Sequence, residues 1–460
     1  MKNLKMPTPS PSNTSGIGGF NLELNELRGQ SLEVHLPPQS SGDLIGGRGV
    51  VYNSLSTVDD FSDDIEFHVP PDPECCFVLN QSRLEGCFVV KDESGANVAA
   101  TDKVVLAPHY SACLFSQIQI YLNGTQVCDQ SSGVSYPFKH HIDTMLSYHV
   151  NTMEYALQAE GCLPNHYGAC GFLFDPVTGF NDNSTCVCFK NAREKILNGK
   201  KVYFSSTIGA DILRMDKYLP PNIDIKIKLK RFNRKFGIAQ NEAAKTFSIS
   251  LQDVKLRMRK VLPALEIRNR SNVRLNSRPG FISYEDSHLK QFHIPVGSTN
   301  YSANYINTDM GLMPNQAIFA IIDSAVLSKE KSKMYPFRFV PAKLSSVMIK
   351  KNARPILPLA MECNFDEGNY IQLYEHFMSN LSAKISITAK SFALDKFFLC
   401  FDLTPDKCHS FHNHLSEPGN LEIDLTFSTA TTKSYTLISY CFYNASLRID
   451  NNGQVSKSYF

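Results

Sequence analysis

Residues 222–230 read NIDIKIKLK, and residues 420–428 read NLEIDLTFS. In both stretches an apolar residue occupies every second position, a pattern typical of a β-strand with one buried face and one exposed face. The same alternation recurs over Phe115–Leu122 and over Leu437–Ile449. Gly, Pro or Asn residues separate such stretches, and helical periodicity is scarce. The sequence therefore predicts a mainly β protein with a few short helices.

Four elements occur twice along the chain in the same order, at offsets of roughly 190–230 residues. The pairs are Phe115–Val127 with Leu344–Ile356, Tyr136–His149 with Tyr370–Leu381, Asn222–Lys230 with Asn420–Ser428, and Val254–Met258 with Ala445–Ile449. The second pair consists of helix candidates and the others of strands, the first with a turn at Asn123 or Asn352. This order indicates two copies of one β domain, each large enough for an eight-stranded antiparallel sandwich. Alternation alone does not distinguish a jelly roll from an immunoglobulin-like sandwich.

Composition and charge exclude several classes of protein. The 460 residues are 43% apolar and 20% charged, which is typical of a globular chain and not of a disordered or fibrous one. Forty-six Lys and Arg against 44 Asp and Glu leave a net charge of +2, too little for a chain that mainly neutralises nucleic acid.

The cysteines and the N-terminal residues bear on the compartment. The 13 cysteines are scattered, and MKNLKMPTPSPS at the start lacks the apolar core of a signal peptide. We therefore expect reduced thiols in the cytosol or nucleus. No apolar run of this sequence reaches the ~20 residues of a membrane-spanning helix, so no membrane span is expected.

Two neighbouring segments carry a resemblance to a known family. Val104–Val127 (VVLAPHYSACLFSQIQIYLNGTQV) and Tyr136–Tyr148 (YPFKHHIDTMLSY) contain, in order, Leu-Ala-Pro, Leu-Phe-Ser-Gln, Leu-Asn-Gly and a Tyr-Pro helix. In this order they resemble the major capsid proteins of Polinton/Maverick elements and adintoviruses. The resemblance continues at Gly209–Asp211, Leu219–Asn222, Gly311–Gln316, Tyr335–Phe339, Phe401–Asp406, Gly419–Phe427 and Ile449–Gln454. It departs from the family pattern at His109–Tyr110, where a Val-Asn pair is expected.

The resemblance implies an all-β double jelly roll, in which one chain forms two eight-stranded antiparallel β sandwiches. It also implies a structural role, as a homotrimer with a pseudo-sixfold outline that tiles an icosahedral virion shell. Penton and other minor capsid proteins are implied as partners, and assembly is expected in the host cytoplasm or nucleus. Neither an enzymatic activity nor a cofactor is implied.

We expect three regions along the chain. Residues 1–45 are predicted to form a flexible N-terminal arm, because Met6–Gly19 (MPTPSPSNTSGIGG) offers almost nothing to bury. The first jelly roll is expected at residues 46–267 and the second at 268–460. Residues 151–200 are rich in Gly, Asn and Cys and weakly periodic, so they are predicted to form a long surface loop of the first jelly roll.

One cluster has the composition of a metal site. Residues 408–414 read CHSFHNH and Glu417 follows, and cupin enzymes hold a metal on a jelly roll with similar ligands. A cupin needs ligands on strands and a further His on a later strand, whereas this stretch lies between turn residues and no His follows His414. The spacings of the loop cysteines also match zinc sites poorly, at Cys162, Cys170, Cys186 and Cys188. We therefore predict an exposed polar loop and no metal, cofactor or catalytic residue.

A cupin-like metalloenzyme and a carbohydrate-binding β-sandwich protein remain as alternatives. If the chain is a cupin-like enzyme, we expect a monomer or dimer with bound metal. If the chain is a carbohydrate-binding protein, we expect exposed aromatic side chains on one sheet and affinity for glycans. Hexagonal trimers or shells are predicted by the capsid function alone.

Charge placement suggests how jelly rolls meet. Between Asp224 and Lys260 there are eleven Lys or Arg residues and three acidic ones, an excess of eight positive charges. In the second copy, the positions that match Asp224 and Lys226 are acidic. We predict contacts between neighbouring jelly rolls that set orientation more than affinity, formed by Lys226, Lys228, Lys230, Glu422 and Asp424. A solvated face that discourages edge-to-edge aggregation, or non-specific contact with packaged DNA, would also explain the basic stretch.

Overall fold

The computed structural model of the chain describes residues 42–58, 64–148, 152–153, 156–162, 192–240, 245–307, 310–328, 336–381, 385, 387–408 and 414–459. Its strands and helices belong to Leu44–Phe460, which forms one unit by its internal contacts. Within these described residues the strands form five antiparallel sheets.

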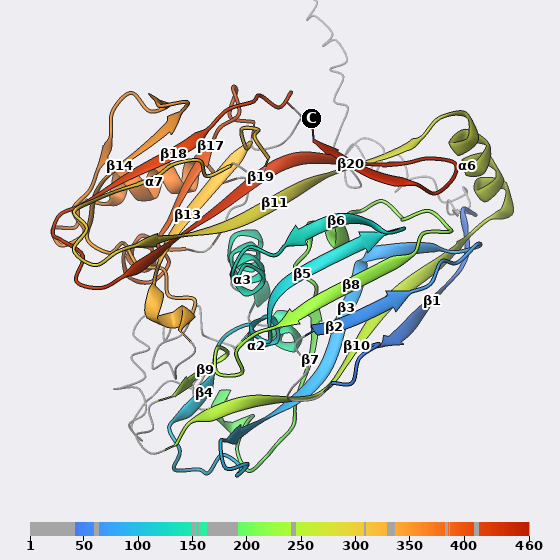
Figure 1. Ribbon diagram of the computed structural model, residues 1–460, viewed down its shortest axis with the longest axis horizontal. Coiled ribbons are helices and arrows are strands. Elements are labelled where there is room, and N and C mark those ends of the chain that lie inside the picture. The colour runs from blue at the N-terminus through green and yellow to red at the C-terminus, as the bar shows by residue number, and fades with distance from the viewer. Residues whose placement is uncertain are drawn as a thin grey trace, which may run out of the picture. The chain divides into compact units, whose positions relative to one another are not determined.

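The strands that precede helix α6 (Leu265–Ser277) form the first half of the fold (Figure 1). Its eight principal strands are β1 (Leu44–Asn53), β2 (Asp64–Val69), β3 (Cys76–Asp92), β5 (Phe115–Leu122), β6 (Thr125–Gln130), β7 (Val202–Thr207), β8 (Ile225–Arg231) and β10 (Phe247–Pro263). They build one sheet in the order β1-β10-β3-β7 and another in the order β2-β8-β5-β6. A short additional sheet pairs β4 (Val104–Leu106) with β9 (Ile238–Gln240).

The strands that follow α6 form the second half, coloured yellow to red in Figure 1. Its eight principal strands are β11 (Gly280–Ile294), β12 (Asn300–Ala303), β13 (Gln316–Asp323), β14 (Leu344–Lys351), β15 (Arg354–Pro355), β17 (Phe398–Asp402), β18 (Leu421–Phe427) and β19 (Tyr435–Ile449). They build sheets in the orders β11-β19-β13-β17 and β12-β18-β14-β15. The short strands β16 (Met361–Glu362) and β20 (Val455–Tyr459) extend these sheets at β14 and β19.

The two halves share one topology. When the eight principal strands of each half are numbered along the chain, each half has one sheet in the order 1-8-3-6 and one in the order 2-7-4-5. Two four-stranded antiparallel sheets interleaved in this way form a jelly roll. The predicted fold class, a double jelly roll, is thereby confirmed. The repeated sequence elements occupy equivalent places, namely β5–β6 with β14–β15, β8 with β18, β10 with β19, and helix α3 (Tyr136–Ser147) with α7 (Ile371–Ser379).

The repeated Asn turns are equivalent in detail. Asn123 and Asn352 both have positive φ, 46° and 51°, in the left-handed region that Asn tolerates better than most residues. In each turn the Asn Oδ1 accepts the backbone N–H at the start of the neighbouring strand, from Asp224 at 2.7 Å and from Asn420 at 2.8 Å. The same local chemistry thus closes the same hairpin twice.

Alternating burial explains the strand pattern of the sequence. On β8, Ile225, Ile227 and Leu229 are 0% exposed, while the lysines between them lie on the outer face of the sheet. On β18, Leu421 and Ile423 are likewise buried between partly exposed acidic residues. Each sheet therefore contributes one apolar face to the core between the two layers of its jelly roll.

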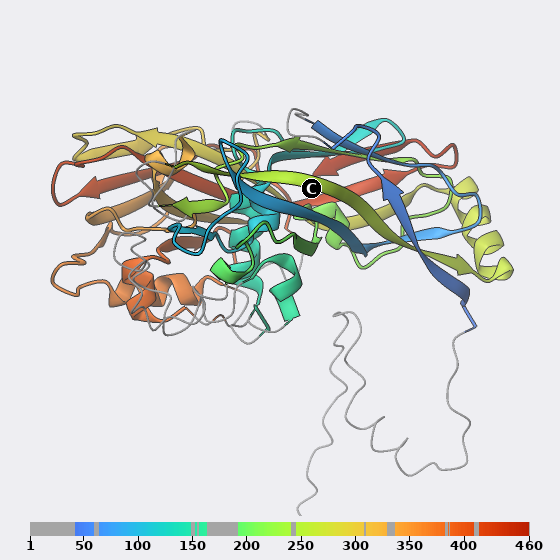
Figure 2. The same cartoon turned by 90° about the horizontal axis from the view of Figure 1, so that it is seen from below.

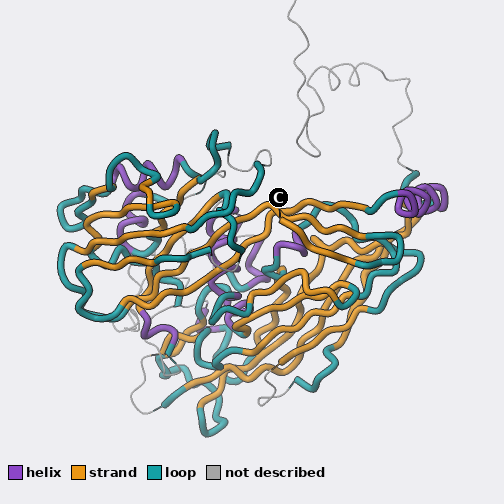
Figure 3. Tube along the Cα trace, turned by 45° about the horizontal axis from the view of Figure 1, so that its top comes forward, coloured by secondary structure: helices purple, strands orange, loops and turns teal. Residues whose placement is uncertain are grey.

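Helix α6 joins the two halves and was not predicted. None of its residues is buried, so it lacks the apolar stripe by which a helix is recognised in a sequence. Figure 3 shows it at one end of the strands, and Figure 2 shows α7 and α8 (Ala389–Leu394) on one side of the second half. The predicted boundary between residues 267 and 268 falls inside α6.

Two of the predicted regions lie mainly outside the described residues. Of the arm predicted at 1–45, only residues 42–45 are described, and Leu44 and Ile45 already belong to β1. This glycine-containing segment pairs with the long strand β10, and the arm that precedes it stays a prediction. Of the loop predicted at 151–200, the structure describes residues 152–153, 156–162 and 192–200, which include the 3₁₀ helix η1 (Ala156–Glu160).

The ten cysteines in the described part of the chain are free thiols. Among the described helices, none has the length and apolar character needed to cross a membrane.

Gly86 lies where neighbouring strands of the first half leave no space for a side chain. A Cβ atom at this position would lie 2.3 Å from the Asp253 carbonyl oxygen and 2.8 Å from the Phe204 ring. We expect Gly86→Ala to lower the free energy of unfolding by about 1–3 kcal/mol, the usual cost of overpacking. Urea unfolding measures the change, and Gly49→Ala is the matched control because nothing lies within 4 Å of a Cβ there. Equal stability of the two variants would contradict the prediction.

Candidate functional site

Helix α3 lies between the two halves and is buried along almost its whole length. Every residue from Tyr136 to Leu146 is buried, although this stretch includes Lys139, two histidines and Asp143. A helix buried on all sides normally carries apolar residues, so each of these polar side chains requires a partner. For Lys139 and Asp143 the partners come from both halves of the chain.

The ammonium group of Lys139 joins the two halves. Nζ lies 3.0 Å from Asp143 Oδ2 and 2.7 Å from Asp211 Oδ1 in the first half. In the second half it lies 2.7 Å from Ser287 Oγ and 2.8 Å from the Tyr440 hydroxyl. Burial lowers the pKa of Lys139, but Asp143 and Asp211 outweigh this effect and hold the pKa above its ordinary value. Lys139 is therefore charged inside the protein.

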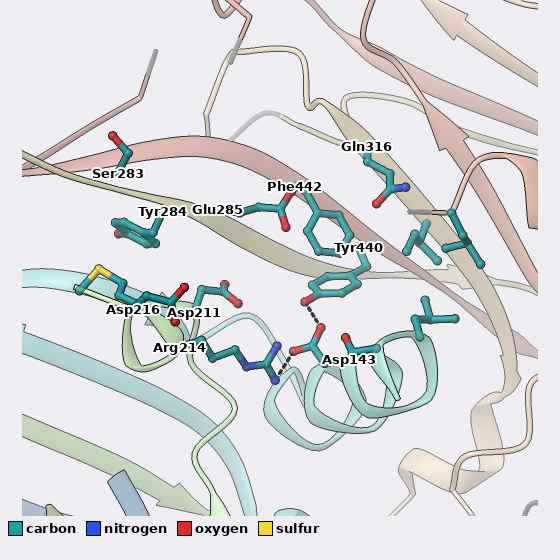
Figure 4. Close-up of a pocket in the computed structure, with 15 residues that line it drawn as sticks. Asp143, Asp211, Arg214, Asp216, Ser283, Tyr284, Glu285, Gln316, Tyr440 and Phe442 are labelled. Atoms are coloured by element: carbon teal, nitrogen blue, oxygen red, sulfur yellow. Dashed lines mark hydrogen bonds and ion pairs between the residues drawn. The ribbon is translucent and has the colours of Figure 1, made fainter. Parts of the chain in front are cut away.

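Arg214 and Tyr440 complete the cluster around Asp143 (Figure 4). An Arg214 Nη lies 2.9 Å from Asp143 Oδ2, and the Tyr440 hydroxyl donates to Asp143 Oδ1. Burial raises the pKa of Asp143, but Arg214 and Lys139 outweigh it and hold the pKa below its ordinary value. We call the six residues the polar junction: Lys139, Asp143, Asp211, Arg214, Ser287 and Tyr440.

The polar junction is neutral as a whole and links four elements, namely α3, η2, β11 and β19. It holds two cations and two carboxylates, with Asp211 and Arg214 on the 3₁₀ helix η2 (Asp211–Arg214). Asp211 Oδ2 also accepts the backbone N–H of Ser287 at 2.9 Å, at the free edge of β11. Buried ion pairs of this kind contribute little net stability over apolar packing, but removing one partner is costly. The junction therefore fixes how the halves meet.

A second contact attaches the end of the chain to strand β6. Asp286 is 4% exposed and accepts from Lys457 Nζ and from the Tyr459 hydroxyl, both at 2.7 Å. Lys457 Nζ also donates to the Val127 carbonyl oxygen at 3.0 Å, which connects β20 to the first half. Burial raises the pKa of Asp286, but His288 and Lys457 outweigh it and lower the pKa to about 2.

Aromatic rings form the third contact between the halves. Phe337, from the segment between β13 and β14, stacks on His141 with ring centroids 4.1 Å apart. The same ring meets Phe138 edge-on at 5.6 Å and Phe236 at 6.3 Å. Pairs of rings add stabilisation beyond their buried area, so this contact is the apolar complement of the polar junction.

His140 has a different environment from its two neighbours on α3. Its ring stacks on Tyr136, and its Nε2 lies 4.0 Å from Glu160 Oε2. Neither ring nitrogen has a hydrogen-bond partner in the described part of the protein. Burial lowers the pKa of His140 to about 4, more than Glu160 raises it, so the ring is neutral near pH 7.

A cleft of about 370 Å³ opens beside the polar junction (Figure 4). Asp143, Asp211 and Arg214 line it from the first half, and Glu285 and Gln316 line it from the second. Carboxylates outnumber cations along its walls, but Asp143 and Asp211 already bind Lys139 and Arg214. These two carboxylates of the cleft wall therefore belong to the polar junction and are not free to bind a ligand.

The charged residues predicted from the sequence lie on outer sheet faces and have local partners. Lys226 and Lys228 lie 3.2 Å and 3.6 Å from the carboxylate of Glu66 on the neighbouring strand β2. Asp424 pairs with Lys350 of β14, and Glu422 accepts from the Asn420 side chain at 2.9 Å. Lys230 is exposed. Among the described residues, these partners do not include a pair between the predicted basic and acidic residues.

The predicted metal-like cluster is partly described. His409 and His412 lie outside the described residues, as do Cys170, Cys186 and Cys188. Glu417 pairs with Lys351 and not with the cluster. Cys408 and His414 lie beside Asp406, a residue that sequence reasoning did not count as a ligand.

The polar junction was missed by sequence reasoning. Its available signal is the pair Lys139 and Asp143, four residues apart on a predicted helix that also carries Ile142, Met145 and Leu146. Its other members are single polar residues far along the chain, and Tyr440 is 301 residues from Lys139. A single amino-acid sequence does not show that two residues so far apart along the chain are in contact.

Comparison of the fold with solved structures gives consistent matches to viral capsid proteins. The mavirus major capsid protein is 13% identical, with 99% of this chain and 97% of that chain covered at a TM-score of 0.56. A chain of the Sputnik virophage is 13% identical, with coverages of 98% and 94% and a TM-score of 0.59. The Faustovirus major capsid protein is 9% identical, with coverages of 92% and 94% and a TM-score of 0.53.

No protein-family model matches the sequence, and no curated protein is similar to it in sequence. The matches therefore rest on the arrangement of the strands and extend over both halves of the chain. The chain has the double jelly-roll fold of the virophage and giant-virus major capsid proteins.

Proposed function

We propose that the chain is a structural viral major capsid protein that self-assembles as trimeric capsomers, and that these tile an icosahedral shell. The observation that carries the proposal is the double jelly roll, which aligns with the mavirus and Faustovirus major capsid proteins over 99% and 92% of this chain. In this function the work of the protein is self-association, and no residue has a catalytic role.

The contact between the two halves supports a specific way for one chain to meet the next. Within the chain, the edge strand β11 lies against α3, η2 and β6 of the first half. Because the halves repeat one topology, the equivalents are the edge strand β1 in the first half and α7 with β15 in the second. We infer that β1 of one copy lies against α7 and β15 of its neighbour.

Exposed side chains on these two surfaces are complementary. Val51 of β1 is 51% exposed, Ile371 of α7 is 56% exposed, and Leu359 beside β15 is 79% exposed. Exposed basic residues lie on β1 and its partner β10, namely Arg48, Arg257 and Arg259. Exposed acidic residues lie on and before α7, namely Glu362, Asp366, Glu367 and Glu375. Apolar patches and opposite charges of this kind favour a specific contact.

This contact uses two different surfaces, so it joins copies head to tail. A head-to-tail contact closes into a ring when its rotation divides a full turn. Three chains in such a ring place six jelly rolls around the axis, which is a homotrimer with a pseudo-sixfold outline. The division into two jelly rolls on either side of α6 is part of this proposal.

We expect Ile371→Glu to weaken each of the three contacts in the trimer by about 30-fold, because a charge at the centre of an apolar contact costs about 2 kcal/mol. Light scattering coupled to size-exclusion chromatography measures the mass of the particles. Leu415→Glu is the matched control, since Leu415 is 89% exposed and lies outside the two surfaces. If both variants form trimers as readily as the natural chain, the proposed surface is wrong.

The lysines on β8 and the acids on β18 remain candidates for contacts between neighbouring copies. Glu66 already neutralises part of the positive charge on β8, and Lys350 part of the negative charge on β18. We therefore expect these residues to contribute less to contacts between copies than unpaired charges would. The double variant Lys226→Glu, Lys228→Glu in the same light-scattering experiment tests the proposal. Unchanged assembly at low and high salt would contradict it.

Electron microscopy of the expressed full-length protein tests the function itself. Hexagonal trimers or closed shells are expected for a capsid protein. A metal-bound monomer or dimer would favour the cupin-like enzyme, and glycan binding without particles would favour the carbohydrate-binding sandwich.

The capsid proposal also includes partners and a location. A protein that tiles a shell belongs to the virion and needs penton and other minor capsid proteins at its vertices. Assembly in the host cytoplasm or nucleus is part of the proposal, as is non-specific contact between the basic sheet faces and packaged DNA. We also propose that the chain comes from a Polinton/Maverick element or an adintovirus, on the basis of the sequence resemblance alone.

A further inference from the structure

Three metal-ligating side chains converge in the connection between β17 and β18. Asp406, Cys408 and His414 each place a ligand atom within 4.8 Å of the other two. Cys408 Sγ lies 3.4 Å from His414 Nε2, and Asp406 Oδ1 lies 2.9 Å from the same nitrogen. The cluster is therefore a set of one sulfur, one nitrogen and one oxygen around a common point.

The shared nitrogen distinguishes a metal site from a nucleophilic site. In a Cys-His-Asp catalytic arrangement, one ring nitrogen faces the thiol while the other is held by the carboxylate. In this cluster the same nitrogen, Nε2, lies near both Cys408 and Asp406, so the three possible ligand atoms gather around one point. Zinc bonds of about 2.3 Å to sulfur and 2.0–2.1 Å to nitrogen place those two ligand atoms about 3.5 Å apart in a tetrahedral site. The Sγ to Nε2 distance agrees with that value.

The backbone holds the first two ligands in place. Lys407, which lies between them, has a positive φ of 51°, and this left-handed residue forms the turn from which Asp406 and Cys408 come together. The Cys408 N–H donates to Thr404 Oγ1 at 3.1 Å, and Thr404 Oγ1 donates to Asp402 Oδ1 at 2.6 Å. Asp402 is buried at the end of β17, so the turn is fixed to the sheet.

We propose that Asp406, Cys408 and His414 bind a zinc ion as carboxylate, thiolate and neutral imidazole, with water in the fourth position. Zinc is the metal that suits this mixture of sulfur, nitrogen and oxygen ligands. Binding releases the proton of the Cys408 thiol and ties residue 406 to residue 414. The site revises the prediction of a metal-free loop, and it does not depend on the capsid function.

Cobalt(II) titrated into the full-length protein tests the site. We expect one cobalt per chain, with a thiolate-to-cobalt charge-transfer band in the near ultraviolet that zinc abolishes on displacement. Cys408→Ser should remove the band. His414→Gln should weaken binding by more than about 100-fold, because losing a ligand costs more than losing an outer-shell partner of a ligand.

Two control variants separate this site from other metal binding. Cys75→Ser removes another partly exposed thiol, and Glu417→Gln removes the carboxylate that pairs with Lys351. Both should keep the band. The proposal is overturned if the natural chain shows no thiolate band, if the band survives Cys408→Ser, or if Glu417→Gln abolishes it.

Alkylation of the natural chain provides a test that needs no variant. Zinc should protect Cys408 from iodoacetamide, as measured by mass spectrometry of its peptide, while the labelling of Cys75 stays unchanged. Equal labelling of Cys408 with and without zinc would overturn the proposal even if the variants fail to fold.

Discussion

Replacing Lys139 with methionine is expected to lower the free energy of unfolding by about 3–5 kcal/mol. The ammonium group is fully buried, and it is the shared partner of Asp143, Asp211, Ser287 and Tyr440. Methionine fills a similar volume, so little of the cost comes from a cavity. The cost arises because the junction keeps two carboxylates and one cation, which leaves an uncompensated negative charge inside the protein. Urea unfolding at a fixed protein concentration measures the loss, since assembly adds to apparent stability.

A second substitution tests the electrostatic cause. The double variant Lys139→Met, Asp211→Asn is neutral again and should recover a large part of the lost stability. Lys226→Met is the control for the loss of a lysine, because Lys226 lies on a sheet surface, where an ion pair contributes at most about 1 kcal/mol. A loss below about 1 kcal/mol in Lys139→Met, or no recovery in the double variant, would contradict the role assigned to the junction.

Much of the fold was predictable because its signals are local and repeated. The alternation over 222–230 and 420–428 predicts β8 and β18, and the matching Asn turns predict two equivalent hairpins. Burial of one sheet face requires this alternation, so the physical cause and the sequence signal coincide. Helix α6 was not predictable in this way, since a helix without buried residues has no apolar periodicity.

The candidate sites were less predictable, because they depend on which distant residues meet. The sequence gives the sign of the charges on β8, but it does not show that Glu66 on β2 faces Lys226 and Lys228. The sequence shows the metal-like composition of residues 408–414. In the structure, however, Glu417 pairs with Lys351, and the carboxylate beside His414 is that of Asp406. The left-handed turn at Lys407 brings Asp406 next to Cys408. The amino-acid composition of the segment does not reveal such a turn.

His140→Phe is expected to flatten the dependence of stability on pH between about 6.5 and 4. Burial lowers the pKa of His140 from 6.5 to about 4 in the folded protein, whereas the ring has its ordinary pKa in the unfolded chain. Between these values the unfolded chain binds a proton that the folded protein does not, so stability is complete above pH 6.5 and falls with acidification. The difference corresponds to about 3 kcal/mol between pH 7 and pH 4. Phenylalanine does not titrate and retains a ring against Tyr136.

The comparison of the two proteins, and not the natural profile alone, isolates His140. Asp395 has a pKa raised by burial to about 6, so its contribution runs the opposite way and is lost as pH rises from 3.8 through 6. Asp286, with a pKa of about 2, loses its contribution mainly below pH 4. Both terms are common to the natural chain and the variant, so they cancel in the difference of free energies from urea unfolding. His293→Phe, at an exposed position of β11, should leave the profile unchanged. Parallel profiles for the natural chain and His140→Phe would contradict the prediction, because a buried neutral ring at this place in α3 requires them to diverge below pH 6.5.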